Sequence, residues 1–334
     1  MTDYADLAAF LSLPRLTGLA LSPDGSRLVA AVQRPDAKNA RYVSSLWEVP
    51  LAGGEPVRLT RSEKGESAPA FRPDGSLLFI SSRPDPDGEE DETALWVLPP
   101  VGEPRVLARS AGGLSGPVVA ADAGTVVVAG SRLPGSADPA GDGARRTVRK
   151  DRRINAILHT GLPIRYWDHE LGVDEPRLLV LGPEGGPRDA APRDVAGGPR
   201  DAAGGLRDLA PDAGPALVNA DYSITADGAT VATTWRTRGP GGTVDTRVVL
   251  IDVATGTRTP LPTEADCEHE TPRIAPDGSA VALLRFPVEG TYETPTEWDL
   301  LIVPVAGGPA VPVEVGDLYP NEWVWSADAG TLYV

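Results

Sequence analysis

The sequence has a single cysteine, no long apolar run and fewer basic than acidic residues, and each scarcity excludes a class of structure or partner. One cysteine, Cys267, stands alone among 334 residues, so the chain has no disulfide framework of its own. No run of about 18 apolar residues occurs, so no membrane-spanning helix is expected. The start, MTDYADLAAFLSLPRL, carries acids and no basic run before its apolar stretch, unlike a secretory signal. These features predict a cytoplasmic protein with no membrane partner.

Basic residues are also in deficit. There are 31 Lys and Arg residues against 47 Asp and Glu residues, and the formal net charge is −16. A chain this acidic is repelled by phosphate backbones, so nucleic acid is not expected as a partner. Glycine (37) and proline (34) are abundant and together exceed a fifth of the chain. So many breakers disfavour long helices and favour short strands joined by turns.

A ten-residue pattern recurs along the chain. It reads LSPDGSRLVA at 21–30, FRPDGSLLFI at 71–80 and IAPDGSAVAL at 274–283. Asp-Gly between two apolar runs predicts a tight hairpin, because glycine accepts positive φ and aspartate tolerates turn geometry. The aspartates of all copies, including two degenerate ADAG copies, are Asp24, Asp74, Asp122, Asp227, Asp277 and Asp328. Their separations are 50, 48, 105, 50 and 51 residues.

Each repeat also has a second half. A further strand, a glycine turn and a fourth strand come after the aspartate, as in LWEVPLAGGEPVRLT (46–60) and LLIVPVAGGPAVPV (300–313). Four strands with a period of about 50 residues are typical of a β-propeller blade. A single blade cannot bury both faces, whereas stacked blades can. The sequence therefore predicts an all-β protein, a β-propeller, in which Trp47 and Trp96 occupy matching packing positions.

The separation of 105 residues is explained by one blade with two insertions. The outer strand pair after Asp122 begins late, at RLLVLGPEGG (177–186), which predicts an insertion at about 136–170. A second insertion is predicted at about 188–205, where an Arg-Asp pair repeats in a Gly/Pro/Ala background typical of a flexible surface loop. This division gives a helical segment at 1–15 and a propeller at 16–334 with five blades and the start of a sixth. An incomplete propeller exposes sheet edges, so we expect further blades from a longer chain or from a partner.

Several stretches resemble the N-terminal propeller of the prolyl oligopeptidase family of serine peptidases. They are DLAAFLSLPRLTGLALSPDGSRLVAAV at the start, PIRYWDHELG (163–172) and EHETPRIAPDGSAVALLR (268–285). The closest similarity is to its acylaminoacyl-peptidase or dipeptidyl-peptidase-like bacterial branch. The resemblance implies a propeller that covers a C-terminal α/β-hydrolase domain with a Ser-Asp-His triad. The blade motif itself also occurs in TolB-type propellers.

This chain has no recognisable catalytic residues of its own. A Gly-x-Ser-x-Gly elbow is missing, since GGLSGP (112–117) has Pro117 where the second glycine belongs. The three histidines, His159, His169 and His269, are not near a plausible nucleophile in the sequence. The resemblance therefore implies that the catalytic residues lie in the hydrolase domain, which these 334 residues do not include.

The first insertion has the most unusual text. ARRTVRKDRR (144–153) places six basic residues within ten, and PIRYWDHELG comes shortly after it. One interpretation is a substrate-binding or gating arm, formed by Arg165, Trp167, Asp168, His169 and Glu170, in which the arginine pairs with a peptide carboxylate and the acids with an ammonium group. The alternative is structural: the aromatic residues anchor the insertion, and the basic run is a solvated face or an interdomain contact.

A second candidate site comes from the repeat register. Polar residues that stand just before the innermost strands would line one mouth of the central channel; they are Glu66, Asp221, His269, Glu270 and Glu322. Such acids would attract peptide N-termini, although ordinary polar loops explain them as well. DCEHE (266–270) is too tightly spaced for a tetrahedral metal site, so neither a metal nor another cofactor is expected.

The sequence thus predicts the substrate-gating propeller of a serine peptidase that hydrolyses short peptides by acyl transfer. Its expected partners are a peptide substrate and the hydrolase domain, and self-association into a homo-oligomer is compatible with them. The alternative is a TolB-like propeller that serves protein–protein contacts. The residues do not distinguish an exopeptidase from an endopeptidase.

Overall fold

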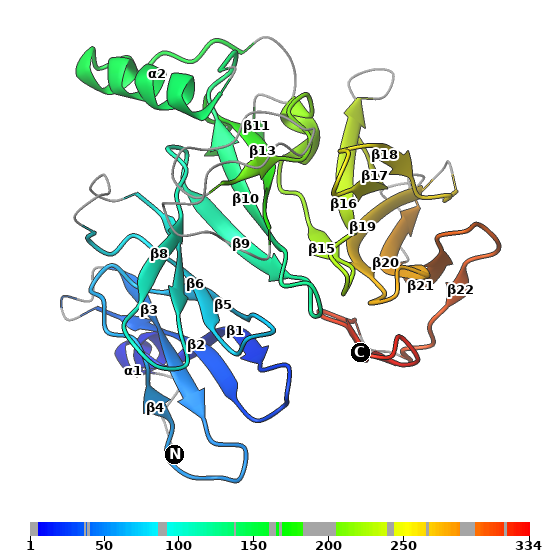
Figure 1. Cartoon of the computed structure of the whole chain (residues 1–334), viewed down its shortest axis with the longest axis horizontal. Coiled ribbons are helices and arrows are strands. Elements are labelled where there is room, and N and C mark those ends of the chain that lie inside the picture. Colours follow the sequence, from blue (N-terminus) through cyan, green and yellow to red (C-terminus); the bar gives the residue numbers. More distant parts are fainter. Residues whose placement is uncertain are drawn as a thin grey trace.

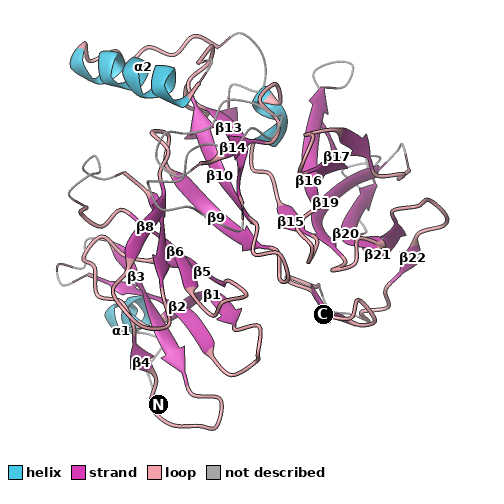
Figure 2. Ribbon diagram, in the orientation of Figure 1, coloured by secondary structure: helices cyan, strands magenta, loops and turns pink. Residues whose placement is uncertain are grey.

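The fold is all-β, and strands are the main secondary structure of the described residues (Figure 2). The computed structural model describes residues 6–36, 38, 41–85, 92–136, 138–159, 165–166, 169–182, 205–238, 244–264, 267–287, 298–316 and 319–334. Within this part of the chain, five four-stranded antiparallel sheets and a sixth hairpin succeed one another, as expected for propeller blades. Helix α1 (Leu7–Ser12) precedes the first sheet, and the side chain of Asp6 caps its N-terminus.

The strands of each sheet are consecutive, except in the third blade. Blade 1 contains β1 (Arg15–Leu21), β2 (Leu28–Pro35), β3 (Tyr42–Val49) and β4 (Val57–Arg58). Blade 2 contains β5 (Ser67–Phe71), β6 (Leu77–Ser81), β7 (Ala94–Leu98) and β8 (Arg105–Ala108). Blade 4 contains β15 (Tyr222–Ile224), β16 (Thr230–Arg238), β17 (Val244–Asp252) and β18 (Arg258–Pro260). Blade 5 contains β19 (Cys267–Ile274), β20 (Ala280–Pro287), β21 (Asp299–Pro304) and β22 (Val311–Pro312), and the sixth hairpin pairs β23 (Val324–Trp325) with β24 (Leu332–Tyr333).

Blade 3 interrupts this order. Its strands are β9 (Leu114–Val119), β10 (Val126–Arg132), β13 (Glu175–Leu181) and β14 (Arg207–Asp208). Between β10 and β13 the chain forms helix α2 (Pro139–Asp151) and a small hairpin of β11 (Arg165–Tyr166) and β12 (His169–Glu170). A 3₁₀ turn (Gly214–Leu217) leads into blade 4. The single sheet shows that the long separation of the repeats contains one blade; the second predicted insertion, 188–205, lies almost wholly outside the described residues.

The core lies between blades. Strand alternation points Leu77 and Phe79 of β6 toward blade 1, and Leu78 and Ile80 toward blade 3. In β17 the same alternation points Val248 toward blade 5 and its neighbour Val249 toward blade 3. The inner strands β1, β5, β9, β15 and β19 contact one another in turn, so the blades form an arc (Figure 1). Each blade thus depends on its neighbours for burial, as the repeat predicts.

The Asp-Gly turns have one conformation. Gly25, Gly75, Gly228 and Gly278 all have φ between 70° and 77°. In each turn the aspartate accepts a hydrogen bond from the backbone N–H two residues on, as Asp24 does from Ser26 at 3.0 Å. The Ser22 hydroxyl donates as well, and these bonds lower the pKa of Asp24 to about 2. The repeated aspartate is therefore a turn former.

Candidate functional site

The inner strands share a feature that the repeat analysis missed. The pairing of β5, β9 and β19 is interrupted by a bulge at Ala68-Pro69, Gly116-Pro117 and Thr271-Pro272. The residue before each proline has a positive φ, of 50°, 56° and 53° respectively. A bulge redirects the neighbouring side chains, and bulges are common beside functional sites. The signal was present as the triplets SAP, SGP and ETP, and the second of these lies in the string that failed as a nucleophile elbow.

Tyr222 of blade 4 holds the bulge of β9. Its hydroxyl donates to the carbonyl of Gly116 and accepts a hydrogen bond from the Ala129 N–H at 2.9 Å. Burial raises the pKa of this phenol well above its usual value. A Cβ on Gly116 would lie 2.8 Å from the Tyr222 oxygen. The contact therefore joins two inner strands and leaves room only for glycine.

Replacing Gly116 with alanine is expected to lower the free energy of unfolding by about 2 kcal/mol, half from the left-handed backbone and half from the displaced hydroxyl. Gly25 is the matched control, because it has a φ of 70° and a Cβ there meets nothing within 4 Å. Gly25→Ala should cost about 1 kcal/mol, the backbone contribution alone. Denaturant unfolding measures both, and equal losses would contradict the role of Tyr222.

Two of the predicted channel-mouth acids, Asp221 and Glu270, interact across the neighbouring inner strands β15 and β19. Asp221 is exposed immediately before β15, and its carboxylate accepts a hydrogen bond from the Thr271 hydroxyl at 3.4 Å. Glu270 is half-buried next to Thr271. Burial raises the pKa of Glu270, the charge of Asp221 raises it further, and Arg236 opposes both. The pair concentrates negative charge beside the bulge of β19.

Glu268 extends this group along the same face of β19, two residues before Glu270. Burial raises its pKa, with contributions from Glu270 and Asp245. These carboxylates repel one another, and an external cation would relieve the repulsion. Asp221, Glu268 and Glu270 together form the acidic group.

The other residues of the predicted ring have different surroundings. Glu66 is buried, and its carboxylate accepts hydrogen bonds from the Thr60 hydroxyl and the Ser62 N–H, both at 2.9 Å, and from Arg83. The Arg83 guanidinium in turn lies over the Phe79 and Trp96 rings. Glu66 is thus committed to holding blades 1 and 2 together, and it does not belong to the acidic group.

His269 and Glu322 are the two remaining residues of the predicted ring, and their surroundings differ from each other. His269 is only 1% exposed, and neither ring nitrogen has a hydrogen-bond partner among the residues that the structure describes. Burial and the nearby Arg247 and Arg285 lower its pKa to about 4, against the opposing effect of Glu264. Glu322 is exposed shortly before β23. His269 therefore belongs to the blade interior, whereas Glu322 stays a predicted mouth residue.

The predicted gating arm is described only in part. Arg165 is exposed in β11. In the backbone register of the hairpin, Arg165 lies opposite Glu170 of β12 and Tyr166 lies opposite His169. Trp167 and Asp168 lie outside the described residues, and for His169 and Glu170 the backbone alone is described. The arm is thus a short hairpin, and its role in substrate binding stays a prediction.

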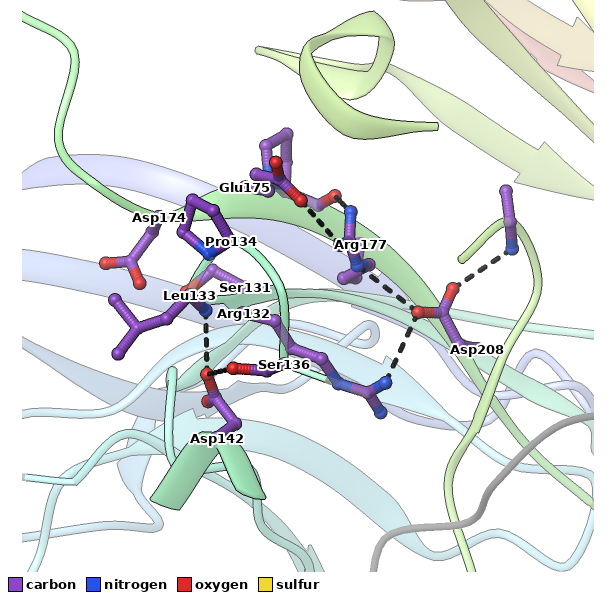
Figure 3. Close-up of polar contacts among 12 residues, drawn as sticks. Ser131, Arg132, Leu133, Pro134, Ser136, Asp142, Asp174, Glu175, Arg177 and Asp208 are labelled. Atoms are coloured by element: carbon purple, nitrogen blue, oxygen red, sulfur yellow. Dashed lines mark hydrogen bonds and ion pairs between the residues drawn. The ribbon is translucent and has the colours of Figure 1, made fainter. Parts of the chain in front are cut away.

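A buried charged cluster lies where this insertion leaves blade 3 (Figure 3). The Asp208 carboxylate of β14 lies 3.3 Å from Nε of Arg177 on β13 and 3.7 Å from Nη1 of Arg132 on β10. All three residues are at most 6% exposed, and burial raises the pKa of Asp208. Arg177 also donates to Glu175 at 2.7 Å. The cluster joins the three strands from which both insertions emerge.

A second set of contacts fixes α2 to the same place. Asp142, buried on α2, accepts from the Leu133 N–H at 2.7 Å and from Arg146 Nε at 2.8 Å. Arg146 also donates to Asp174 at 2.5 Å, just before β13. Figure 3 shows Asp142 turned toward the chain at Leu133 and Ser136. The insertion is therefore held at its entry and exit by ion pairs, which sequence reasoning did not foresee.

Two features are absent from the part of the chain that the structure describes. Among these residues, no helix has the length and apolar character needed to cross a membrane. In the same part of the chain, no group of three or more His, Cys, Asp and Glu side chains is arranged to hold a metal ion.

Comparisons with known proteins place the fold. No family model matches the chain. A segment of 73 residues is 38% identical to dipeptidyl-peptidase 5 of Porphyromonas gingivalis, and it covers 22% of this chain and 11% of that protein. The solved acylaminoacyl peptidase of Pyrococcus horikoshii superposes with a TM-score of 0.55 over 88% of this chain and 38% of its own, at 10% identity. This chain thus spans well under two thirds of the length of either relative.

A third similarity is to an enzyme whose name gives a different activity from the two peptidases. A solved oligogalacturonate lyase, in complex with manganese, matches with a TM-score of 0.56 at 14% identity, over 94% of this chain and 68% of that one. Identities this low show a shared fold and leave the activity open. The chain is an all-β protein with the propeller fold.

Proposed function

We propose that this propeller gates substrate entry for a serine peptidase that acts on short peptides. The catalytic serine, aspartate and histidine would be supplied by an α/β-hydrolase domain. The local similarity to a dipeptidyl-peptidase and the shared fold of an acylaminoacyl peptidase support this proposal. The successive contacts of the inner strands also support it, because a propeller channel lined by such strands would admit extended chains more readily than folded ones.

The observation that carries the proposal is the acidic group on the neighbouring strands β15 and β19. A peptide N-terminus is a compact cation, and carboxylates in partly desolvated surroundings bind it by charge-assisted hydrogen bonds. Asp221 is exposed and Glu270 half-buried, so the pair can meet an ammonium group without a change in the fold. In this mechanism the chain binds and orients the peptide and excludes larger or acidic substrates. Bond cleavage takes place in the hydrolase domain.

The test is calorimetric titration of the chain with trialanine and with its N-acetylated form. Free trialanine should bind at least tenfold more tightly than the acetylated peptide, because acetylation removes the positive charge. Asp221→Asn/Glu270→Gln should abolish that difference. Glu55→Gln/Glu103→Gln, at two exposed turns, changes the net charge by nearly the same amount and should leave the difference intact.

Equal affinity for the two peptides, or a difference that survives in the Asp221/Glu270 variant, would contradict the gate. Absence of binding by both peptides would contradict it too, and would favour the alternative of a propeller that serves protein–protein contacts.

A further inference from the structure

A cavity of about 490 Å³ opens between blades 4 and 5, at the end of the strands where the Asp-Gly turns lie. Its walls are the turn between β17 and β18 and, from blade 5, Gly278 and Val305. The acidic group lies at the other end of β19, because Glu268 and Glu270 are near the start of that strand and Gly278 follows its end. Cavities of about 300–1,000 Å³ are the size that holds small molecules. This cavity is therefore separate from the site of the proposed function.

The floor of the cavity is apolar and consists of Leu250, Pro260 and Val305. Leu250 is 8% exposed and belongs to the cluster that joins blades 4 and 5, and Val305 packs against that cluster. The floor is thus continuous with the packed core between the two blades. It needs no rearrangement to receive a ligand.

The rim of the cavity is polar. Its side chains are four threonines and one aspartate, namely Thr230, Thr255, Thr257, Thr259 and Asp252. Thr257 and Thr259 are two residues apart in nearly extended chain, so both can line one side with their Cα atoms about 7 Å apart. Each hydroxyl can donate one hydrogen bond and accept two. The rim therefore offers several donors and acceptors above an apolar floor.

Asp252 is the one charged residue of the lining. Its Oδ1 accepts hydrogen bonds from the Thr255 N–H at 2.7 Å and from the Thr255 hydroxyl at 2.8 Å. These bonds lower the pKa of Asp252, so the carboxylate is ionised at neutral pH. Both bonds go to Oδ1, so among the described residues Oδ2 is left for a ligand.

Backbone hydrogen bonds hold the rim in place. The Asp252 N–H donates to the Thr257 carbonyl at 2.9 Å, and the Gly256 N–H donates to the Asp252 carbonyl at 2.8 Å. On the blade 5 side, the Val305 N–H donates to the Ser279 carbonyl at 2.9 Å. A rim that is already ordered loses little conformational freedom when a ligand binds.

The composition of the lining excludes several classes of ligand. It contains an aspartate and no basic side chain, so an anion would be repelled. Arg258, which follows Thr257 in the chain, is engaged by Asp212 and by the Trp235 ring. Calcium and magnesium take several carboxylate or carbonyl oxygens, whereas this lining has one carboxylate. A wholly apolar ligand would leave the hydroxyls and the carboxylate without partners.

We propose that this cavity binds a neutral sugar. A sugar ring carries hydroxyl groups around its edge and C–H groups on its faces, so it matches the polar rim and the apolar floor together. The Asp252 carboxylate accepts hydrogen bonds from ligand hydroxyls, and Thr257 and Thr259 bond to others. One face of the ring packs on the floor. The binding is non-covalent and does not depend on the peptidase function.

Saturation-transfer NMR of the full chain with the methyl glycosides of glucose, galactose and mannose tests the proposal. At least one glycoside should bind, and at least fivefold more tightly than cyclohexanol, which has a similar ring and one hydroxyl. Thr257→Val/Thr259→Val should weaken that glycoside at least fivefold, because it removes two hydroxyls and keeps the shape of the side chains. Asp252→Asn should weaken it at least fivefold as well, because hydrogen bonds to an ionised group are the stronger ones.

The chain provides matched controls. Asp328 accepts bonds from the Ser326 hydroxyl and the Gly330 N–H in the sixth hairpin, much as Asp252 does in its own turn, so Asp328→Asn should bind the glycoside like the wild type. Thr17→Val/Thr331→Val removes two hydroxyls at exposed positions outside the cavity and should also bind normally.

Four results would overturn the proposal. They are binding of none of the three glycosides, equal affinity for cyclohexanol, equal weakening by the control variants, and tighter binding of cyclohexylammonium than of every glycoside. The last result would indicate that Asp252 makes the cavity a cation site.

Discussion

Asp208→Asn is expected to lower the free energy of unfolding by about 3–5 kcal/mol, the cost of breaking a buried ion pair by removing one partner. The substitution leaves the guanidinium groups of Arg132 and Arg177 in the interior without the carboxylate that faces them in Figure 3. Asparagine retains an oxygen that can accept the Ala210 N–H, now bonded at 3.0 Å. The loss therefore reports the charge of Asp208 and not the shape of the site.

A control for this substitution lies four residues away. Asp212 forms an ion pair with Arg258 at 2.6 Å, but its side chain is 66% exposed. Asp212→Asn should cost at most about 1 kcal/mol, because water screens an exposed pair. Guanidinium unfolding monitored by tryptophan fluorescence measures both variants. A loss for Asp208→Asn no greater than that for Asp212→Asn would contradict the buried cluster.

A triple variant that replaces all three charged residues with apolar ones also tests the cluster. Replacing it as a whole, in Arg132→Met/Arg177→Met/Asp208→Leu, removes every buried charge together. Apolar replacement of a buried ion pair is often neutral or stabilising, so the triple variant should recover most of the stability lost in Asp208→Asn. Stability lower than in the single variant would indicate that packing, and not charge, dominates this part of blade 3.

The repeat made the propeller predictable from the sequence. An Asp-Gly turn depends only on its own few residues, so it can be recognised in the sequence. The spacing of these turns gives the number of blades without any knowledge of long-range contacts. Helix α2 was not predicted, although Asp138 before Pro139 is a recognisable helix start and six of the thirteen helix residues are Ala, Arg or Lys. The glycine and proline content of the whole chain argued for strands, and that average concealed one helical segment.

Individual site residues were harder to predict, because repeat register does not fix burial. Glu66 and Asp221 stand at equivalent places in their blades, yet one is buried against Arg83 and the other is exposed. The difference comes from Thr60 and Arg83, which lie just after β4 and β6 and which a blade motif does not encode. The same holds for Arg132, Arg177 and Asp208, which are distant in sequence and adjacent only in the folded sheet.

His269 should make the protein less stable as the pH falls from 7 toward 4. Its pKa is about 4 in the folded protein and 6.5 when exposed, so between these values the unfolded chain binds a proton that the folded chain does not. Stability from this group is complete above pH 6.5 and is lost as the pH approaches 4. The full loss is about 3 kcal/mol, of which about 2 kcal/mol falls between pH 7 and pH 5.

His269→Leu isolates this contribution. The variant should be at least as stable as the wild type at pH 7, because it removes two buried ring nitrogens that have no hydrogen-bond partner among the described residues. Between pH 7 and pH 5 it should lose about 2 kcal/mol less than the wild type. Subtracting the stability change of the variant from that of the wild type cancels the contributions of Glu268 and Glu270, whose raised pKa values act in the opposite direction. His159→Leu, at an exposed position, should keep the wild-type dependence; parallel curves for His269→Leu and the wild type would show that the His269 ring is solvated in the folded state.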